Sequence, residues 1–245
     1  MTRRGRLAVA ALACALIAAP AEAQAPPPLF TQACSACHGE HGEGVRGKGP
    51  SLKGAGAAAA DFYLGTGRMP LSHPDVAPQR TRPPFNAQAR KELTAYIASL
   101  GCRQGIPRSD CGPGAGPAVP AVHPSKGDLQ QGFDAFTDHC AGCHAVTARG
   151  GVAPPGAAPA LQQANATQIA EAVRVGPYLM PKFSERQIDQ HTLDSIAAYV
   201  LSTHRLPDKG GWGIGNIGPI PEGLVAWLLA GTVLLIVVRV IGERR

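Results

Sequence analysis

Apolar residues recur at helical spacing in two separate stretches of the chain. In the first, Leu93, Tyr96, Ile97 and Leu100 follow the i, i+3, i+4, i+7 spacing of an amphipathic helix. The second stretch has a similar pattern, carried by Ile188, Leu193, Ile196, Ala197, Tyr199 and Val200. We find no convincing alternation of apolar and polar residues, which would indicate half-buried strands. The pattern therefore predicts an all-α protein with much loop.

The chain begins with a short apolar run that has the features of an export signal. Three arginines lie within the first six residues, an apolar segment follows over Leu7–Ala19, and Ala21 and Ala23 form a small-residue cleavage site. The run is short for a membrane helix, which needs about 20 apolar residues. We predict that residues 1–23 are a signal peptide, with a retained N-terminal anchor as the alternative.

A second apolar run, Leu224–Ile241, is broken only by Thr232 and Arg239. As a helix it would cover about 27 Å, enough for the core of a bilayer. Trp227 lies near one boundary, where aromatic residues gather in membrane proteins, and arginines crowd the other end. The positive-inside rule therefore places the C-terminus in the cytoplasm and the preceding domains outside it. A buried helix of a soluble protein is the alternative.

Between these ends the chain repeats itself. Each repeat starts with a short helical segment ending in Cys-x-x-Cys-His. A Gly- and Pro-rich loop, a helical piece running into Met-Pro and an amphipathic helix follow. We assign the two domains to residues 29–101 and 127–206. Gly-rich linkers then occupy 102–126 and 207–219, and a transmembrane helix occupies 220–241.

Composition and charge narrow the function classes. Gly (30) and Pro (23) are abundant and aromatic residues make up only 5%, which suits small domains built around a bulky apolar cofactor better than one large core. The net charge of +6 comes partly from arginines that flank the terminal apolar runs. No basic stripe with interleaved aromatics is present, so we expect no nucleic-acid partner.

The seven cysteines fall into distinct groups. Cys14 lies inside the N-terminal apolar run, and two Cys-x-x-Cys pairs open the repeats. Cys102 and Cys111 remain, separated by eight residues in the linker. Because an exported protein meets an oxidising environment, we expect these two to form a disulfide, with two unpaired thiols as the alternative.

Both Cys-x-x-Cys-His motifs match the pattern for covalent attachment of c-type haem. Two thiols on one helical turn reach the two vinyl groups of the porphyrin, and the next His points its imidazole at the iron. The expected attachment and proximal residues are Cys34, Cys37, His38, Cys140, Cys143 and His144. A zinc or iron–sulfur site is the competing interpretation, but it leaves both histidines without a shared role. A thioredoxin-like motif needs a βαβ context, which is absent from the pattern.

The sixth iron ligands are predicted to be Met69 and Met180. They are the only methionines after the initiator, one in each repeat, and each is followed by proline. Met/His is a known haem pairing that raises the reduction potential, whereas methionine is otherwise a common gap-filler in cores. His73 is the best rival in the first repeat. The remaining histidines are expected at the surface: His41, His123, His139, His191 and His204.

Two loop prolines complete the predicted sites. Pro50 and Pro159 each follow their attachment motif and precede a small residue and a leucine. We expect a nearby backbone carbonyl to orient the proximal histidine at each of them, because such hydrogen bonds commonly tune metal-bound histidines. Loop prolines without such a role are the alternative.

The repeats resemble class I cytochrome c domains in tandem, and the whole arrangement resembles a more particular family. It is similar to the dihaem cytochrome c subunit of the actinobacterial menaquinol–cytochrome c reductase, the cytochrome bcc complex. The segments that carry this resemblance are Cys34–Gly39, Gly65–Pro70, Cys140–His144, Met180–Ser184, Gly210–Gly215 and Gly218–Gly223. Members of the family often keep an N-terminal membrane segment, whereas the segment here is short with a plausible cleavage site.

The resemblance implies an electron relay carrying two covalently bound haem c groups in a membrane. Its expected partners are a cytochrome b subunit, a Rieske iron–sulfur subunit and an aa-type cytochrome oxidase, besides membrane lipid. Electrons would pass from the Rieske centre through one haem to the other and on to the oxidase. Enzyme activity would belong to the assembly rather than to this chain. The alternatives are a stand-alone dihaem cytochrome serving another periplasmic dehydrogenase, a dihaem peroxidase, and a protein for haem storage or sensing.

Overall fold

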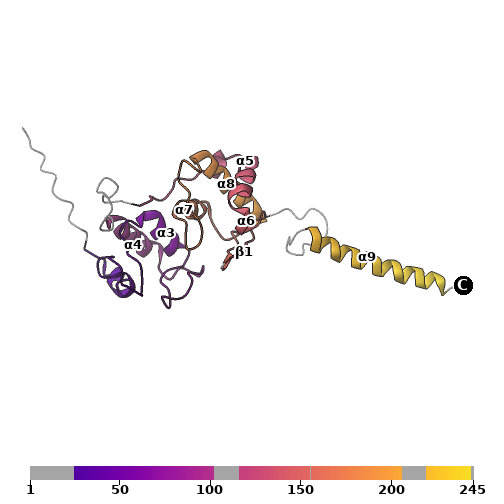
Figure 1. Cartoon of the computed structure of the whole chain (residues 1–245), viewed down its shortest axis with the longest axis horizontal. Helices are drawn as coiled ribbons and strands as arrows, with labels where there is room; N and C mark the ends of the chain where they lie inside the picture. Colours follow the sequence, from indigo (N-terminus) through magenta and orange to yellow (C-terminus); the bar gives the residue numbers. More distant parts are fainter. Residues whose placement is uncertain (1–24, 102–115, 155, 206–218, 244–245) are drawn as a thin grey trace, which may run out of the picture. The chain divides into compact units, whose positions relative to one another are not determined.

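The computed structural model describes residues 25–101, 116–154, 156–205 and 219–243 (Figure 1). The chain divides into two compact units, one ending at Leu201 and the other starting at Ser202. The predicted signal peptide, the Cys102–Cys111 disulfide and almost all of the second Gly-rich linker lie outside the described residues.

Four helices build the first repeat: α1 (Pro28–Ala33), α2 (Ser35–His38), α3 (Gly56–Gly65) and α4 (Ala87–Ser99). The side chain of Asn86 accepts a hydrogen bond from the Ala89 amide (2.9 Å) and so caps α4. The core forms where α1 meets α4, and there the Phe30 ring packs edge-on against Tyr96 with 4.7 Å between centroids. Its buried residues are Phe30, Ala60, Leu64, Leu93, Tyr96 and Ile97.

The second repeat follows the same order of helices. Its elements are η2 (Pro124–Lys126), α5 (Leu129–His139), α6 (Ala141–His144), β1 (Gly151–Ala153), β2 (Gly156–Ala158), α7 (Ala166–Val175), α8 (Gln190–Ser202) and η3 (Thr203–Arg205). Asn165 and Gln168 form a capping box at the start of α7, and Gly176 ends that helix in the left-handed conformation. Ile188, expected on the closing helix, instead lies in the turn before α8, where it is fully buried.

A short antiparallel hairpin departs from the expectation of helices and loops alone. Strands β1 and β2 pair Gly151 with Ala158 and Ala153 with Gly156. Their sequences, Gly-Val-Ala and Gly-Ala-Ala, contain mostly small side chains. No alternation of apolar and polar residues therefore predicts these strands. The all-α class is otherwise confirmed for the described part of the chain.

Helix α9 (Pro219–Gly242) has the length and composition of a membrane span. Its apolar segment Gly223–Gly242 covers 20 residues whose side chains are exposed, as suits a surface that lipid would cover. The Thr232 hydroxyl donates to the Leu228 carbonyl (2.7 Å), which satisfies the one polar side chain near its middle. Arg239 pairs with Glu243 at the C-terminal end (2.9 Å). The helix lies where the sequence predicted it.

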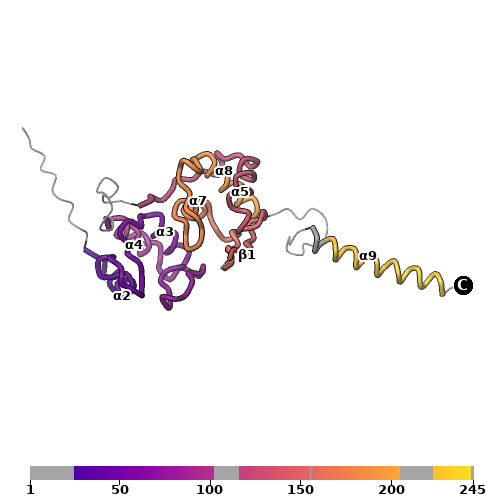
Figure 2. The backbone as a smooth tube through the Cα atoms, viewed as in Figure 1, coloured from indigo at the N-terminus to yellow at the C-terminus, as the bar shows by residue number. Residues whose placement is uncertain are grey.

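The two repeats touch through equivalent helices. Helices α3 and α7, each leading toward its methionine, lie side by side (Figures 1 and 2). A loop of the first repeat adds a hydrogen bond from Arg80 to Gln168 of α7. The Tyr63 hydroxyl of α3 accepts a hydrogen bond from the Tyr178 amide (3.2 Å). The two repeats therefore belong to one compact unit.

Close contact between α5 and α8 depends on Gly132. A Cβ atom at this position would collide with the carbonyl oxygen of Ser195, a backbone atom that cannot move aside cheaply. The Gly132→Ala variant is therefore expected to destabilise the second repeat by about 1–3 kcal/mol, although alanine favours helices. Urea unfolding followed by circular dichroism measures the loss. Gln130→Ala, on an exposed part of the same helix, should stay within about 0.5 kcal/mol; equal stability of Gly132→Ala and the parent would contradict the prediction.

Candidate haem-binding sites

The histidine of each Cys-x-x-Cys-His motif is held by the proline that the sequence analysis singled out. The Nδ1 atom of His38 lies 2.8 Å from the Pro50 carbonyl oxygen, and that of His144 lies 3.0 Å from the Pro159 oxygen. Because a carbonyl only accepts, Nδ1 carries the proton, and Nε2 keeps its lone pair for a metal. The expected orienting bond is confirmed in both repeats, and the carbonyl is the proline's own.

The attachment motifs have nearly the same backbone in both repeats. Cys34 and Cys140 have φ/ψ of −123°/−33° and −125°/−35°, and each leads into a four-residue helix ending at its histidine, α2 or α6. The histidine amide bonds back to the first cysteine's carbonyl at 2.9 Å in each case. This turn brings both thiols and the ring onto one short element, as attachment to one porphyrin edge requires.

Glycines that sequence reasoning did not single out let the following loop approach the motif. A Cβ at Gly49 would lie 2.6 Å from the Cys37 carbonyl oxygen, and one at Gly151 would lie 2.8 Å from that of Cys143. Nearer to the motif in each loop, Gly44 and Gly150 take φ values of +88° and +84°, and their amides donate to the histidine carbonyls of their own motifs. The Gly-rich composition of both loops is the signal that could have revealed them.

Burial changes the ionisation of several site residues. It raises the pKa of the first thiol in each pair, Cys34 and Cys140, to about 11, with a smaller contribution from the neighbouring cysteine. Burial also lowers the pKa of His144, opposed by its bond to Pro159, and so favours the neutral ring that binds a metal. The shift at His144 therefore suits the neutral imidazole that haem ligation requires.

The two methionines lie against the cores of their own repeats. Met69 contacts the first apolar cluster and Met180 the second, and both side chains are partly buried. Their amides are fixed by the carbonyls of Tyr63 (3.2 Å) and Pro177 (3.0 Å). By contrast, the rival His73 is 67% exposed and faces Asp75 at 3.3 Å. The other histidines outside the motifs are exposed as expected, except His204, which is half-buried.

The donor set fits haem c better than a metal centre shared between the pairs. Within the described ranges, no three His, Cys, Asp or Glu side chains gather into a group that could hold a metal ion. Each repeat instead provides two thiols, one oriented imidazole and one thioether at the edge of an apolar cluster. Those are the groups that attach haem c and complete its axial positions.

Comparison with known proteins identifies both repeats. The family described as "Cytochrome c" matches residues 27–101, and "Cytochrome C oxidase, cbb3-type, subunit III" matches residues 127–200. The expected pair of cytochrome c domains is thereby confirmed, and with it the fold class.

Relatives similar over most of the chain share one description, "Cytochrome bc1 complex cytochrome c subunit". The protein from Corynebacterium diphtheriae is 35% identical over 221 residues, which cover 88% of this chain and 79% of the relative. That from Mycobacterium tuberculosis is 36% identical over 202 residues, 82% of this chain and 70% of the relative. A "Cbb3-type cytochrome c oxidase subunit CcoP" from Azospirillum is 27% identical over 70% of this chain.

Proposed function

Because this chain belongs to the family of cytochrome bc1 complex cytochrome c subunits, we propose that it relays electrons through two covalently bound haem c groups in a quinol-oxidising respiratory complex. Its two cytochrome c domains imply covalently bound haem c, and its role is electron transfer. The observation that carries the proposal is the repeated site: in each domain an oriented histidine follows two thiols on one helical turn.

In the proposed sites, each side chain has a separate task. Cys34 and Cys37 would attach the first haem, and the Pro50 carbonyl holds the His38 ring so that its Nε2 can face the iron. Cys140, Cys143 and His144, with Pro159, would do the same in the second domain. When bound, haem supplies a one-electron iron couple. Met69 and Met180 would supply the second ligand of each iron, which would leave no coordination site open for substrate and so favours a relay over a peroxidase.

The proposed route runs from a Rieske iron–sulfur subunit, beside a cytochrome b subunit, to an aa-type terminal oxidase. The relatives' description supports the quinol-oxidising end of this route. The likeness of the second domain to an oxidase subunit supports the oxidase end, because it links this type of domain to a terminal oxidase. Two haem c groups in one chain would replace a separate soluble carrier.

Helix α9 fits a membrane anchor. We propose that its C-terminal end, with Arg239 and the last two arginines, faces the cytoplasm, because positive residues stay on that side. The haem domains would then lie on the opposite face. Such an anchor would hold them close to the membrane-bound donor and acceptor, which removes the need for long-range diffusion.

Purification in mild detergent through a tag on this chain tests the proposal. The expected preparation contains a cytochrome b, a Rieske protein and two covalent haems per chain, and menaquinol reduces those haems. A preparation without cytochrome b would favour the stand-alone cytochrome. Rapid binding of cyanide or peroxide to the ferric protein would favour the peroxidase and overturn the relay.

A further inference from the structure

The contact between the two domains places two carboxyl groups at equivalent positions of equivalent helices. Asp61 lies five residues after the first residue of α3, and Glu171 lies five residues after the first residue of α7. Both helices are otherwise mostly apolar on the faces that they bury. The pair thus sits where the two repeats meet, with one acid contributed by each.

Glu171 is fully buried, with 0% of its surface exposed. Neither of its carboxyl oxygens has a hydrogen-bond donor among the residues that the structure describes. Its polar neighbour is the carboxyl group of Asp61, which can donate only if one of the two acids carries a proton. An unpaired buried carboxylate is costly, whereas one shared proton both removes a charge and supplies the missing hydrogen bond.

The electrostatics agree with this geometry. Burial is the largest cause that raises the pKa of Glu171, followed by the negative charge of Asp61 and the hydrogen bond that a shared proton forms between the two, and the value reaches about 9. The ordinary value for this side chain is 4.5. The raised pKa of Glu171 therefore favours a protonated carboxyl group in this contact.

Nearby cations do not neutralise the pair. Arg80 reaches α7 one turn before Glu171, but its guanidinium donates to Gln168. Arg174 lies one turn after Glu171, and its guanidinium donates to the Phe183 carbonyl (3.4 Å). Glu185 and Asp189 are the charges that act on Arg174. Tyr63 of α3 contributes a hydroxyl that already accepts from the Tyr178 amide.

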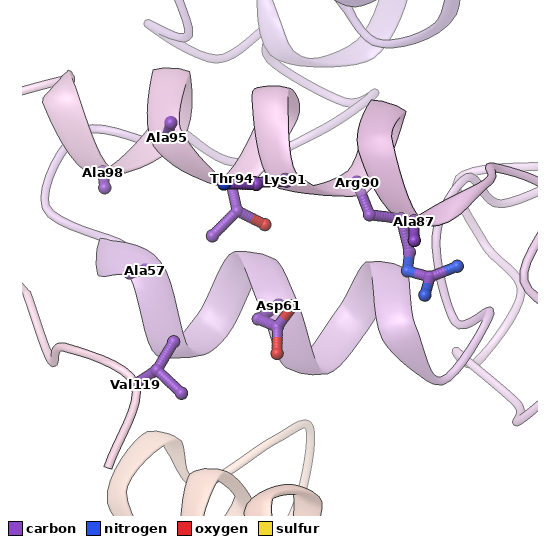
Figure 3. Close-up of a pocket in the computed structure, with 9 residues that line it drawn as sticks. All are labelled: Ala57, Asp61, Ala87, Arg90, Lys91, Thr94, Ala95, Ala98 and Val119. Carbon is purple, nitrogen blue, oxygen red and sulfur yellow. The ribbon is translucent and has the colours of Figure 1, made fainter. Parts of the chain in front are cut away.

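On its other side, Asp61 borders a cavity of about 360 Å³ between α3 and α4 (Figure 3). Arg90 and Lys91 of α4 line this cavity together with Thr94, and the Arg90 guanidinium donates to the Phe85 carbonyl (2.8 Å). Val119 also lines the cavity, and the segment 116–122 to which it belongs carries no titratable side chain. No ion pair to Asp61 or Glu171 is formed within the described part of the chain.

We propose that Asp61 and Glu171 form a proton-binding site that holds the two haem domains together and releases them when the proton is lost. Deprotonation sends the proton to solvent and leaves two facing carboxylates, whose repulsion and burial both oppose contact between α3 and α7. The proposal concerns how the domains meet, so it can fail while the electron-relay function stands.

The sign of the pH effect follows from the raised pKa. In separated domains Glu171 would titrate near its ordinary value of 4.5. Between pH 4.5 and about pH 9, the docked domains therefore bind more protons than the separated domains do. Docking is therefore strongest below the ordinary value and weakens as pH rises through this window, by up to about tenfold per unit. Above about pH 9 the strength of docking no longer changes with pH.

Hydrogen exchange of the full-length, haem-loaded chain in detergent tests the site between pH 5 and pH 9. The Glu171→Gln variant keeps the shape and a donor but removes the titration. Comparing it with the parent at each pH cancels the chemical dependence of exchange on pH. We expect matching exchange of residues 56–65 at pH 5 and exchange at least about tenfold faster in the parent at pH 9. Asp61→Asn should likewise reduce the pH dependence.

The control is Asp134→Asn, which removes an exposed carboxyl group of α5 in the same domain as Glu171. It should follow the parent at every pH. A band of a protonated carboxyl group in the infrared spectrum at pH 7, present in the parent and lost in Glu171→Gln, provides a second readout. Identical exchange profiles for the parent and Glu171→Gln, or absence of that band from the parent, would overturn the proposal.

Discussion

Replacing Met180 by alanine is expected to remove about half of the weak far-red absorption band that marks sulfur-to-iron ligation. Met69→Ala should remove the other half, and the double variant should lack the band, because each thioether would bind one iron. Both methionines already lie at the edge of an apolar cluster, with their backbones held by hydrogen bonds. A spectrum of the oxidised protein in the visible and near infrared measures the loss.

The same substitutions should impair the relay, because loss of the Met ligand lowers the potential of its haem. Each fall of about 59 mV disfavours electron acceptance about tenfold. Met→Ala both lowers the potential and leaves a coordination position of the iron empty. Met180→His separates these two effects, since it should lower the potential while keeping both axial positions filled. His73→Ala, which removes the exposed rival, should leave the band unchanged. An undiminished band in either methionine variant would remove that residue from the iron.

Deleting residues 219–245 is expected to move essentially all of the haem-stained protein from the membrane fraction to the soluble fraction. The segment Gly223–Gly242 is the apolar span of α9, and its exposed Leu, Ile and Val side chains each contribute about 0.3–0.6 kcal/mol to insertion. The chain should be expressed without the other subunits of a complex, so that no partner retains it. Haem staining of the two fractions after centrifugation gives the result.

A chain that lacks only Arg244 and Arg245 keeps the span and should stay in the membrane fraction. The mass of the released protein reports the fate of residues 1–23, because a cleaved chain begins after Ala23. Retention of the truncated chain at its full mass would show that the N-terminal segment anchors it and would contradict the predicted signal peptide.

Much of this protein can be predicted from the sequence, because the residues of each functional motif lie close together in the chain. A Cys-x-x-Cys-His motif places two thiols and a ring on one helical turn wherever that turn lies, and the repeat shows that this happens twice. The apolar run of α9 is equally local, since its length alone matches a bilayer. The orienting role near Pro50 and Pro159 followed from short loops that return to their own motif.

Other features arise only from contacts between distant parts of the chain. The hairpin of β1 and β2 forms by backbone pairing of small residues, so no side-chain pattern marks it. Gly132 matters because Ser195 of α8 comes against it, and helical periodicity cannot show that approach. Glu171 alone looks like an ordinary acid of an amphipathic helix. Folding buries it against Asp61, and the loss of water around two facing carboxyl groups turns it into a proton site.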